Sequence, residues 1–129
     1  MEFLIEKALQ VRKKAYAPYS NFSVGAALET IEGKIFTGCN IENVAFSPTM
    51  CAERVAFSKA ISEGNVNFRR IVIVGGQVNK EPLDFCPPCG VCRQVMTEFC
   101  EEDFEIIMAK TTTEFEIYLL ADILPMGFG

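Results

Sequence analysis

Residues 71–74 of the chain are Ile71-Val72-Ile73-Val74, four apolar side chains in succession. Successive side chains of a strand point to opposite faces of a sheet, so a strand with one wet face alternates apolar and polar residues. A run without polar alternation is typical of a strand that is covered on both faces. The run therefore predicts a central strand with helices on both sides of the sheet.

The segments before this run alternate between helical and strand patterns. Apolar residues between positions 2 and 16 recur at four- and three-residue spacing, which is typical of one face of an amphipathic helix, and Pro18 ends the pattern. Two strand-like segments flank a turn at Gly33, and a second helix stops at Gly64. These elements are predicted at residues 2–16, 22–30, 34–40 and 51–63.

The segments after the run continue the alternation. They are predicted as a helix at 89–100, a strand at 105–110, a short strand after Thr113, a helix at Ile117–Ile123 and a tail at 124–129. This order predicts an α/β fold with three layers, α/β/α, in which a mixed sheet of about five strands has helices on both faces. We expect residues 1–129 to form one domain, since 129 residues, half of them apolar, suffice for one core.

Composition excludes several functional classes. The formal charge of −5 provides no basic footprint for a nucleic acid polymer, so we expect no such partner. The N-terminal segment carries Glu2 and Glu6 among its apolar residues and has the pattern of neither a signal peptide nor a membrane span. We therefore expect a soluble, cytoplasmic protein without a membrane partner.

The absence of histidine constrains the chemistry further. A Ser-His-Asp or Cys-His nucleophile cannot be assembled within one chain that has no histidine. A zinc ion would need Cys, Asp or Glu as ligands. Six cysteines in a reducing compartment favour metal binding or catalysis over disulfides, although Cys39 and Cys100 are interpreted as buried small hydrophobes.

Two cysteines follow Pro88 at the predicted start of a helix. Cys89 and Cys92 are three residues apart, so their side chains share one face of the first turn, which suits two thiolates on one tetrahedral zinc. A third cysteine, Cys51, opens another predicted helix and is followed two residues later by Glu53. Three thiolates would leave a fourth position for water, and Glu53 would handle its protons.

The charge of three thiolates needs compensation. We expect Arg54 to donate hydrogen bonds to a thiolate sulfur and Gln94 to orient that arginine. Two alternatives use Cys86. It would be the fourth ligand of a structural zinc module, or it would begin an iron–sulfur run with Cys89 and Cys92, in which Met96 and Thr97 stand where a cysteine and a proline are expected.

These motifs resemble the small, homotetrameric, zinc-dependent cytidine deaminases. The segments that carry the resemblance are Phe22-Ser23-Val24-Gly25-Ala26-Ala27, Gly38-Cys39-Asn40-Ile41-Glu42-Asn43, Cys51-Ala52-Glu53-Arg54, Pro88-Cys89-Gly90-Val91-Cys92-Arg93-Gln94, Leu124-Pro125 and Phe128-Gly129. The chemistry of zinc deaminases includes a variant with three cysteine ligands. The resemblance implies a cytidine deaminase-like fold with one Zn²⁺ per subunit and Glu53 as the catalytic residue.

The resemblance also implies a set of substrate-binding residues. Asn40 and Glu42 would hold the ribose, chiefly its 3′-hydroxyl, while Phe22 would pack against the pyrimidine and Ala52 would offer backbone groups to it. Phe128 would come from a neighbouring subunit of a homotetramer. Phe46 stands where the family usually has tyrosine, so a hydroxyl contact near the sugar or across a subunit boundary would be missing. Pro48 and Met50 also depart from the family pattern.

The implied reaction is hydrolytic deamination of cytidine, and also of deoxycytidine, in pyrimidine salvage. A nucleoside is expected rather than a nucleotide, because the sugar-facing segment offers Asn40 and Glu42 and no basic cluster for a phosphate. The alternative substrate is a cytosine-containing antibiotic of the blasticidin S type. A structural zinc module without catalysis remains the alternative outside enzymes.

Overall fold

The structure is a computed structural model that describes residues 1–45, 48–81, 85–88 and 90–127. Its elements follow the order α-β-β-α-β-α-β-β-α that the sequence predicts. They are α1 (Glu2–Arg12), β1 (Phe22–Thr30), β2 (Ile35–Cys39), α2 (Ala52–Ser62), β3 (Phe68–Gln77), α3 (Gly90–Phe99), β4 (Glu105–Ala109), β5 (Phe115–Leu119) and α4 (Leu120–Gly127).

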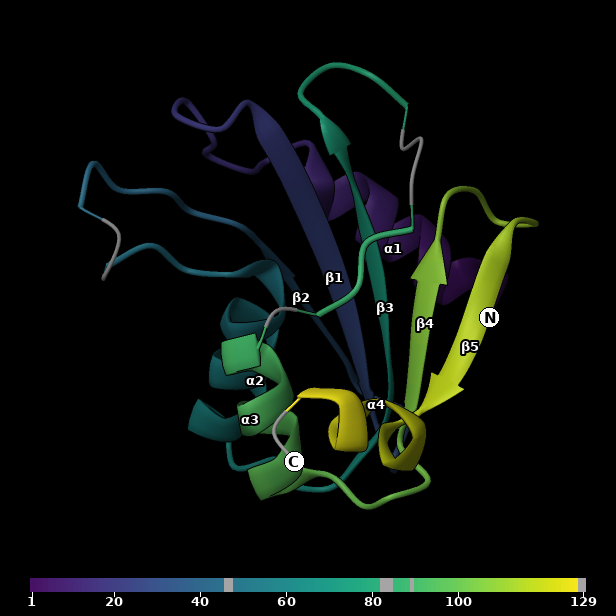
Figure 1. The fold of residues 1–129 in the computed structure, drawn as a ribbon. Coiled ribbons are helices and arrows are strands. Elements are labelled where there is room, and N and C mark those ends of the chain that lie inside the picture. Colours follow the sequence, from purple (N-terminus) through teal and green to yellow (C-terminus); the bar gives the residue numbers. More distant parts are fainter. Residues whose placement is uncertain (46–47, 82–84, 89, 128–129) are drawn as a thin grey trace.

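The described strands form one mixed sheet in the order β2-β1-β3-β4-β5, so β3 is central (Figure 1). β3 and β4 are parallel, and the chain crosses over through α3 to connect them, whereas the other neighbours are antiparallel. The four residues of the run 71–74 lie in the middle of β3 and are fully buried. The prediction of a central, doubly covered strand is confirmed.

Two hydrophobic cores lie on the two faces of this sheet. Val72 and Val74 point to one face, where they pack with Leu4, Ile5 and Ala8 of α1. The intervening Ile71 and Ile73 point to the other face, which the remaining helices cover (Figure 1). That second core includes Ala56, Phe57, Met96 and Leu120 from α2, α3 and α4. The predicted three-layer α/β/α arrangement is therefore confirmed.

The predicted boundaries of the last helix are wrong. Ile117 to Leu119 belong to β5 and pair with β4, with Ile117 opposite Ile107. The helix α4 begins at Leu120 and includes residues 124–127, which the sequence suggested as tail. Pairing with β4 satisfies the backbone groups of this segment, and this non-local gain outweighs local helical preference.

The first helix is also shorter than predicted. It ends at Arg12, and Tyr16 leaves the helix to pair with the chain after β2. The Tyr16 N–H donates to the Asn40 carbonyl at 3.0 Å, and the Tyr16 carbonyl accepts from the Glu42 N–H at 2.8 Å. This pairing brings the segment before β1 against the segment after β2.

Gly38 on β2 determines how closely α2 approaches the sheet. A β-carbon at this position would collide with the Ala52 carbonyl oxygen and would lie 2.6 Å from the Ala56 backbone nitrogen. The backbones of β2 and α2 are therefore in direct contact, which only glycine permits. This contact fixes the first turn of α2 relative to the sheet.

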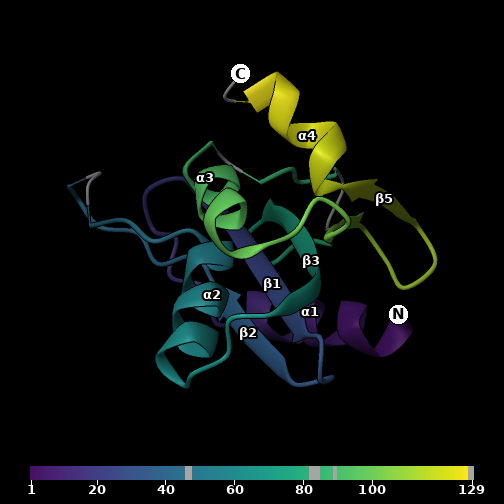
Figure 2. The same ribbon diagram turned by 90° about the horizontal axis from the view of Figure 1, so that it is seen from below.

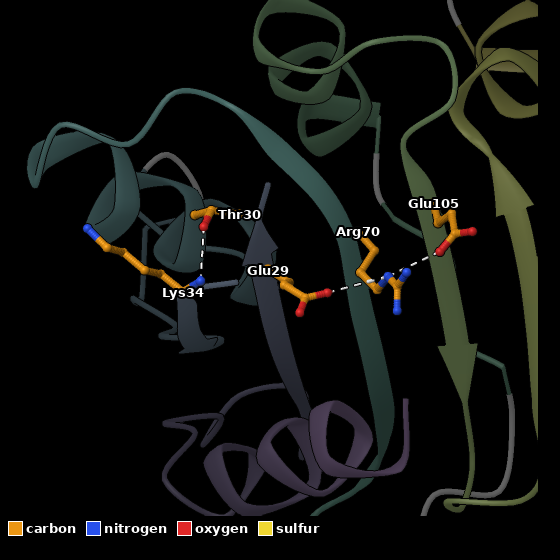
Figure 3. A network of polar contacts seen from close by, with 5 residues as sticks. All are labelled: Glu29, Thr30, Lys34, Arg70 and Glu105. Carbon is orange, nitrogen blue, oxygen red and sulfur yellow. Dashed lines mark hydrogen bonds and ion pairs between the residues drawn. The ribbon is translucent and has the colours of Figure 1, made fainter. Parts of the chain in front are cut away.

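A row of charges crosses the far end of the sheet, where β1 ends and β3 and β4 begin (Figure 3). Arg70 Nε lies 3.1 Å from a Glu105 carboxylate oxygen and 3.5 Å from a Glu29 carboxylate oxygen. The three side chains are neighbours in the strand register, so one guanidinium separates two carboxylates. This end of the sheet is stabilised by cross-strand charge pairing and lies away from the predicted ligands.

Candidate active site

Among the described site residues, Cys51 and Glu53 lie at the start of α2 and Cys92 lies in α3. The two helices pack side by side on one face of the sheet (Figure 2). Cys51 is the N-cap residue of α2, and its backbone is extended, with φ −75° and ψ 150°. Cys92 is the third residue of α3 and is 1% exposed. Both sulfurs therefore lie near helix N-termini, whose partial positive charge favours thiolates.

Glu53 occupies the second position of α2 and is 4% exposed. Among the described residues it is the one acidic or basic residue in the fully buried class. Burial of a carboxylate is costly unless specific partners or a helix N-terminus stabilise it. A buried acid beside Cys51 is the arrangement expected of a proton-transfer group rather than of an ordinary surface acid.

Arg54 lies next to Glu53 and has one unsatisfied buried donor. Its Nη2 donates to the Thr49 carbonyl at 2.9 Å, while its buried Nε–H has no hydrogen-bond partner among the described residues. Native proteins rarely leave such a donor unpaired. A thiolate sulfur in a charged metal site is a suitable acceptor, so this orphaned donor fits the predicted zinc site. Gln94 is exposed on α3, and its role stays a prediction.

The donor atoms available here suit zinc. Cys51 and Cys92 supply sulfur, the softer of the ligand types that zinc accepts, and Arg54 supplies a nearby positive charge. Within the described ranges no group of three Cys, Asp or Glu side chains lies close enough to hold an ion. The third predicted ligand, Cys89, lies outside the described residues, as do the predicted substrate contacts Phe46 and Phe128.

A backbone bridge joins the predicted sugar-binding segment to the start of α2. Ile41 and Met50 exchange two hydrogen bonds of 2.9 and 2.8 Å. Ile41 lies between Asn40 and Glu42, and Met50 directly precedes Cys51. The bridge therefore brings the two groups of predicted site residues together, although they are about ten positions apart in the sequence.

Asn40 is held against the start of β1 by both ends of its amide. Its Oδ1 accepts from the Val24 N–H at 2.9 Å, and its Nδ2 donates to the Phe22 carbonyl at 2.9 Å. These two bonds continue the antiparallel pairing of β1 with β2 by one residue. One amide N–H of Asn40 remains available to a ligand.

Glu42 is held by the loop that leads into β1. One carboxylate oxygen accepts from the backbone N–H groups of Tyr19 and Ser20 at 3.0 and 3.1 Å, and the other accepts from the Ser20 hydroxyl. The Ser20 hydroxyl is the largest cause that lowers the pKa of Glu42 below its ordinary value. The side chain is therefore a fixed anion near neutral pH.

The ring of Phe22 and the thiol of Cys86 both lie beside Gly75 of β3. A β-carbon at Gly75 would lie 3.1 Å from the Phe22 ring and 3.0 Å from the Cys86 sulfur. Glycine thus leaves the space that the ring and the sulfur occupy. The ring is 37% exposed, so a face remains open to a planar ligand. Ala52, which directly follows Cys51, is fully buried at the start of α2.

Several of these contacts were missed from the sequence. Roles for Ser20 and Gly75 are not among the predictions from the sequence. A serine in the Pro18-Tyr19-Ser20 turn and a glycine pair after the apolar run were nevertheless visible signals of these positions. Cys39 and Cys100, interpreted from the sequence as buried small hydrophobes, are both half-buried, and Cys100 packs against the larger core. Burial nevertheless raises the pKa of Cys39 and raises that of Cys100 to about 12, so both thiols stay protonated.

None of the helices in the described part of the chain combines the length and the apolar character that a membrane span requires.

Comparison with known proteins identifies the family. The profile of the family described as "Cytidine and deoxycytidylate deaminase zinc-binding region" matches residues 1–108, a range that contains the predicted zinc ligands and Glu53. The cytidine deaminase of Sporosarcina psychrophila is 42% identical over 129 residues, which are 100% of this chain and 91% of that protein.

A solved structure and a second relative extend the comparison. The crystal structure of cytidine deaminase from Burkholderia pseudomallei superimposes with a TM-score of 0.86 at 42% identity and covers 98% of this chain and 97% of that one. The blasticidin-S deaminase of Bacillus cereus is 33% identical over 99 residues, which are 70% of this chain and 71% of that protein. With the family profile over most of its length and such relatives over nearly all of it, the chain belongs to the family of cytidine and deoxycytidylate deaminases.

Proposed function

We propose that this protein catalyses the hydrolytic deamination of cytidine, and also of deoxycytidine, to uridine or deoxyuridine and ammonia. The observation that carries the proposal is the buried Glu53 in the first turn of α2, two residues after Cys51, in a chain of this family. The relatives from Sporosarcina psychrophila and Burkholderia pseudomallei, which match nearly all of the chain, are cytidine deaminases. We propose a single catalytic domain over residues 1–129, which acts in pyrimidine salvage in the cytoplasm.

The proposed cofactor is one Zn²⁺ per chain, held by Cys51, Cys89 and Cys92. Zinc bound there supplies a Lewis acid that makes a water molecule nucleophilic near neutral pH. Arg54 would donate its orphaned Nε–H to a thiolate and offset part of the negative charge, and Gln94 would orient Arg54.

Glu53 would carry out both proton transfers of the reaction. As the oxygen of the attacking water adds to C4 of the base, Glu53 accepts a proton from that water and delivers it to N3. It then takes the proton of the hydroxyl group now on C4 and carries it to the amino group, so that the C4 carbonyl forms, the C4–N bond breaks and ammonia leaves. One carboxylate thus serves as base and as acid, which suits its enclosed position.

The remaining site residues would bind a nucleoside. Phe22 would pack against the pyrimidine, Ala52 would offer backbone groups to it, and Asn40 and Glu42 would bind the sugar. Phe46 would lie near the sugar, where it lacks the hydroxyl of a tyrosine. The fixed negative charge of Glu42 would repel a phosphate, which favours a nucleoside over a nucleotide.

Two alternatives are less well supported. The antibiotic deaminase matches less of the chain than the cytidine deaminases do, and Asn40 and Glu42 suit a sugar. A structural zinc module closed by Cys86 would not explain why the acid at position 53 is buried. The thiol of Cys86 also lies beside Gly75, as the Phe22 ring does, and we interpret it as a packing residue of the base site.

An ultraviolet assay tests the proposed function directly. The purified protein is expected to convert cytidine to uridine with release of one ammonia per turnover, to lose this activity with a zinc chelator and to recover it with added Zn²⁺. Blasticidin S, assayed in parallel, is expected to be turned over far more slowly. A purified protein that does not convert cytidine, and whose properties a zinc chelator does not change, would contradict the proposal.

We also propose that the enzyme is a homotetramer in which Phe128 completes the active site of a neighbouring chain. Large apolar side chains near the site, including Tyr16, Tyr19, Ile41 and Val44, are exposed in the isolated chain. Such surfaces commonly mark contacts between chains. Light scattering is expected to give a mass of about four times the 14.4 kDa of one chain. A monomeric mass for the active enzyme would contradict this assembly.

A further inference from the structure

We propose that Ser20 is a positioning residue for substrate specificity, which orients the carboxylate of Glu42 toward a sugar hydroxyl. The inference rests on the proposed function, because it assigns to Ser20 a task within the same nucleoside site. It is carried by the hydrogen bonds that converge on Ser20 and Glu42.

Glu42 is a half-buried residue whose carboxylate has an unusually complete set of donors. The backbone N–H groups of Tyr19 and Ser20 lie 3.0 and 3.1 Å from one oxygen, and the Ser20 hydroxyl donates to the other. An exposed glutamate normally samples several rotamers, since little holds its long side chain. Three converging donors remove that freedom before any ligand binds.

The number of donors indicates what the carboxylate can still accept. An ionised carboxylate offers about four acceptor sites on its two oxygens. Two donors occupy one oxygen, and the Ser20 hydroxyl occupies one site of the other. With the donors of the described residues, one site therefore remains on the oxygen that Ser20 orients, and it suits a single hydroxyl donor.

The Ser20 hydroxyl also fixes the start of β1. It accepts from the Phe22 N–H at 3.1 Å while it donates to Glu42. Asn21 between them has φ 60°, a left-handed conformation that asparagine tolerates, and its carbonyl accepts from the Val78 N–H at 2.9 Å. The turn is thereby tied to the end of β3, and one hydroxyl joins the sugar contact to the residue that packs against the base.

The test compares two substrates in variants of the full-length zinc enzyme. Ser20→Ala is expected to raise KM for cytidine about tenfold, with kcat changed less than about twofold, because a hydrogen bond to a charged group is lost. With 3′-deoxycytidine, which lacks the hydroxyl that Glu42 would accept, the same substitution is expected to change KM less than about twofold. Ser20→Thr keeps a hydroxyl and is expected to restore most of the affinity for cytidine.

Ser62→Ala is the matched control. It removes a serine hydroxyl at the C-terminal end of α2, whereas the proposed site lies at the N-terminal end of that helix. The Ser62 hydroxyl donates to the Lys59 carbonyl at 3.0 Å. It is expected to leave both substrates unaffected. Equal losses on cytidine and 3′-deoxycytidine in Ser20→Ala would overturn the inference and indicate a structural role alone. A wild-type enzyme without cytidine turnover would instead overturn the proposed function, and the inference with it.

Discussion

Replacing Glu53 with glutamine is expected to lower kcat for cytidine by about 10³- to 10⁴-fold, the range over which general acid–base catalysis contributes. Glutamine matches the size of the buried side chain but cannot accept a proton from water and pass it to the base. The fold should tolerate the change, because the substitution is nearly isosteric and removes a charge from a side chain that is 4% exposed. Steady-state assays and zinc analysis of the same preparation measure the effect.

Two comparisons make the Glu53→Gln result specific. Glu63→Gln makes the same chemical change at the exposed opposite end of α2 and is expected to retain wild-type turnover. Zinc content in Glu53→Gln is expected to stay at one ion per chain, since the carboxylate is not a proposed ligand. Wild-type activity in Glu53→Gln would contradict the proton-transfer role of Glu53 on which the proposed function rests.

Replacing Gly38 with alanine is expected to lower the free energy of unfolding by about 3 kcal/mol, toward the upper end of the cost of overpacking. The new methyl group would collide with the Ala52 carbonyl and crowd the Ala56 nitrogen, and both obstacles are backbone atoms. The first turn of α2 must therefore move away from β2. Urea unfolding measures the loss of stability.

The Gly38→Ala change should also weaken zinc binding. The new methyl group displaces Ala52, and the proposed ligand Cys51 directly precedes Ala52. Gly33→Ala is a useful comparison, since Gly33 has φ 92° but open space around it. Its backbone strain is expected to cost about 1 kcal/mol without any change in zinc content. A Gly38→Ala protein as stable as the wild type would show that β2 and α2 are not in contact as described.

The layers of this fold were predictable from the sequence because they depend on local hydrophobic patterns. The run Ile71–Val74 lacks polar residues, and in the structure its side chains alternate between two separate cores. The helical spacing of apolar residues between positions 2 and 16 likewise predicted a helix with one apolar face, and Leu4 and Ala8 of α1 are buried against the sheet. The spacing of apolar residues within a segment indicates which of its faces is buried, so this information is present in the segment's own sequence.

The ends of elements were less predictable, because distant partners determine them. Ile117 to Leu119 carry no local signal strong enough to separate a strand from a helix, and the choice follows from pairing with β4. Tyr16 leaves α1 for the same reason, since its backbone pairs with residues on either side of Ile41. Hydrogen bonds between segments far apart in the chain override local preference in both cases.

The chemistry proposed for the site was also visible in the sequence by itself. Residue types and spacing alone pointed to Cys51, Cys92 and the carboxylate of Glu53, because thiolate ligands and a proton carrier have few substitutes in a chain without histidine. Only the tertiary structure showed that Ser20 holds Glu42 and that Gly75 makes room for Phe22. Those contacts join residues 22 and 53 positions apart, and a hydrogen bond or a steric fit exists only once folding has brought its two partners together.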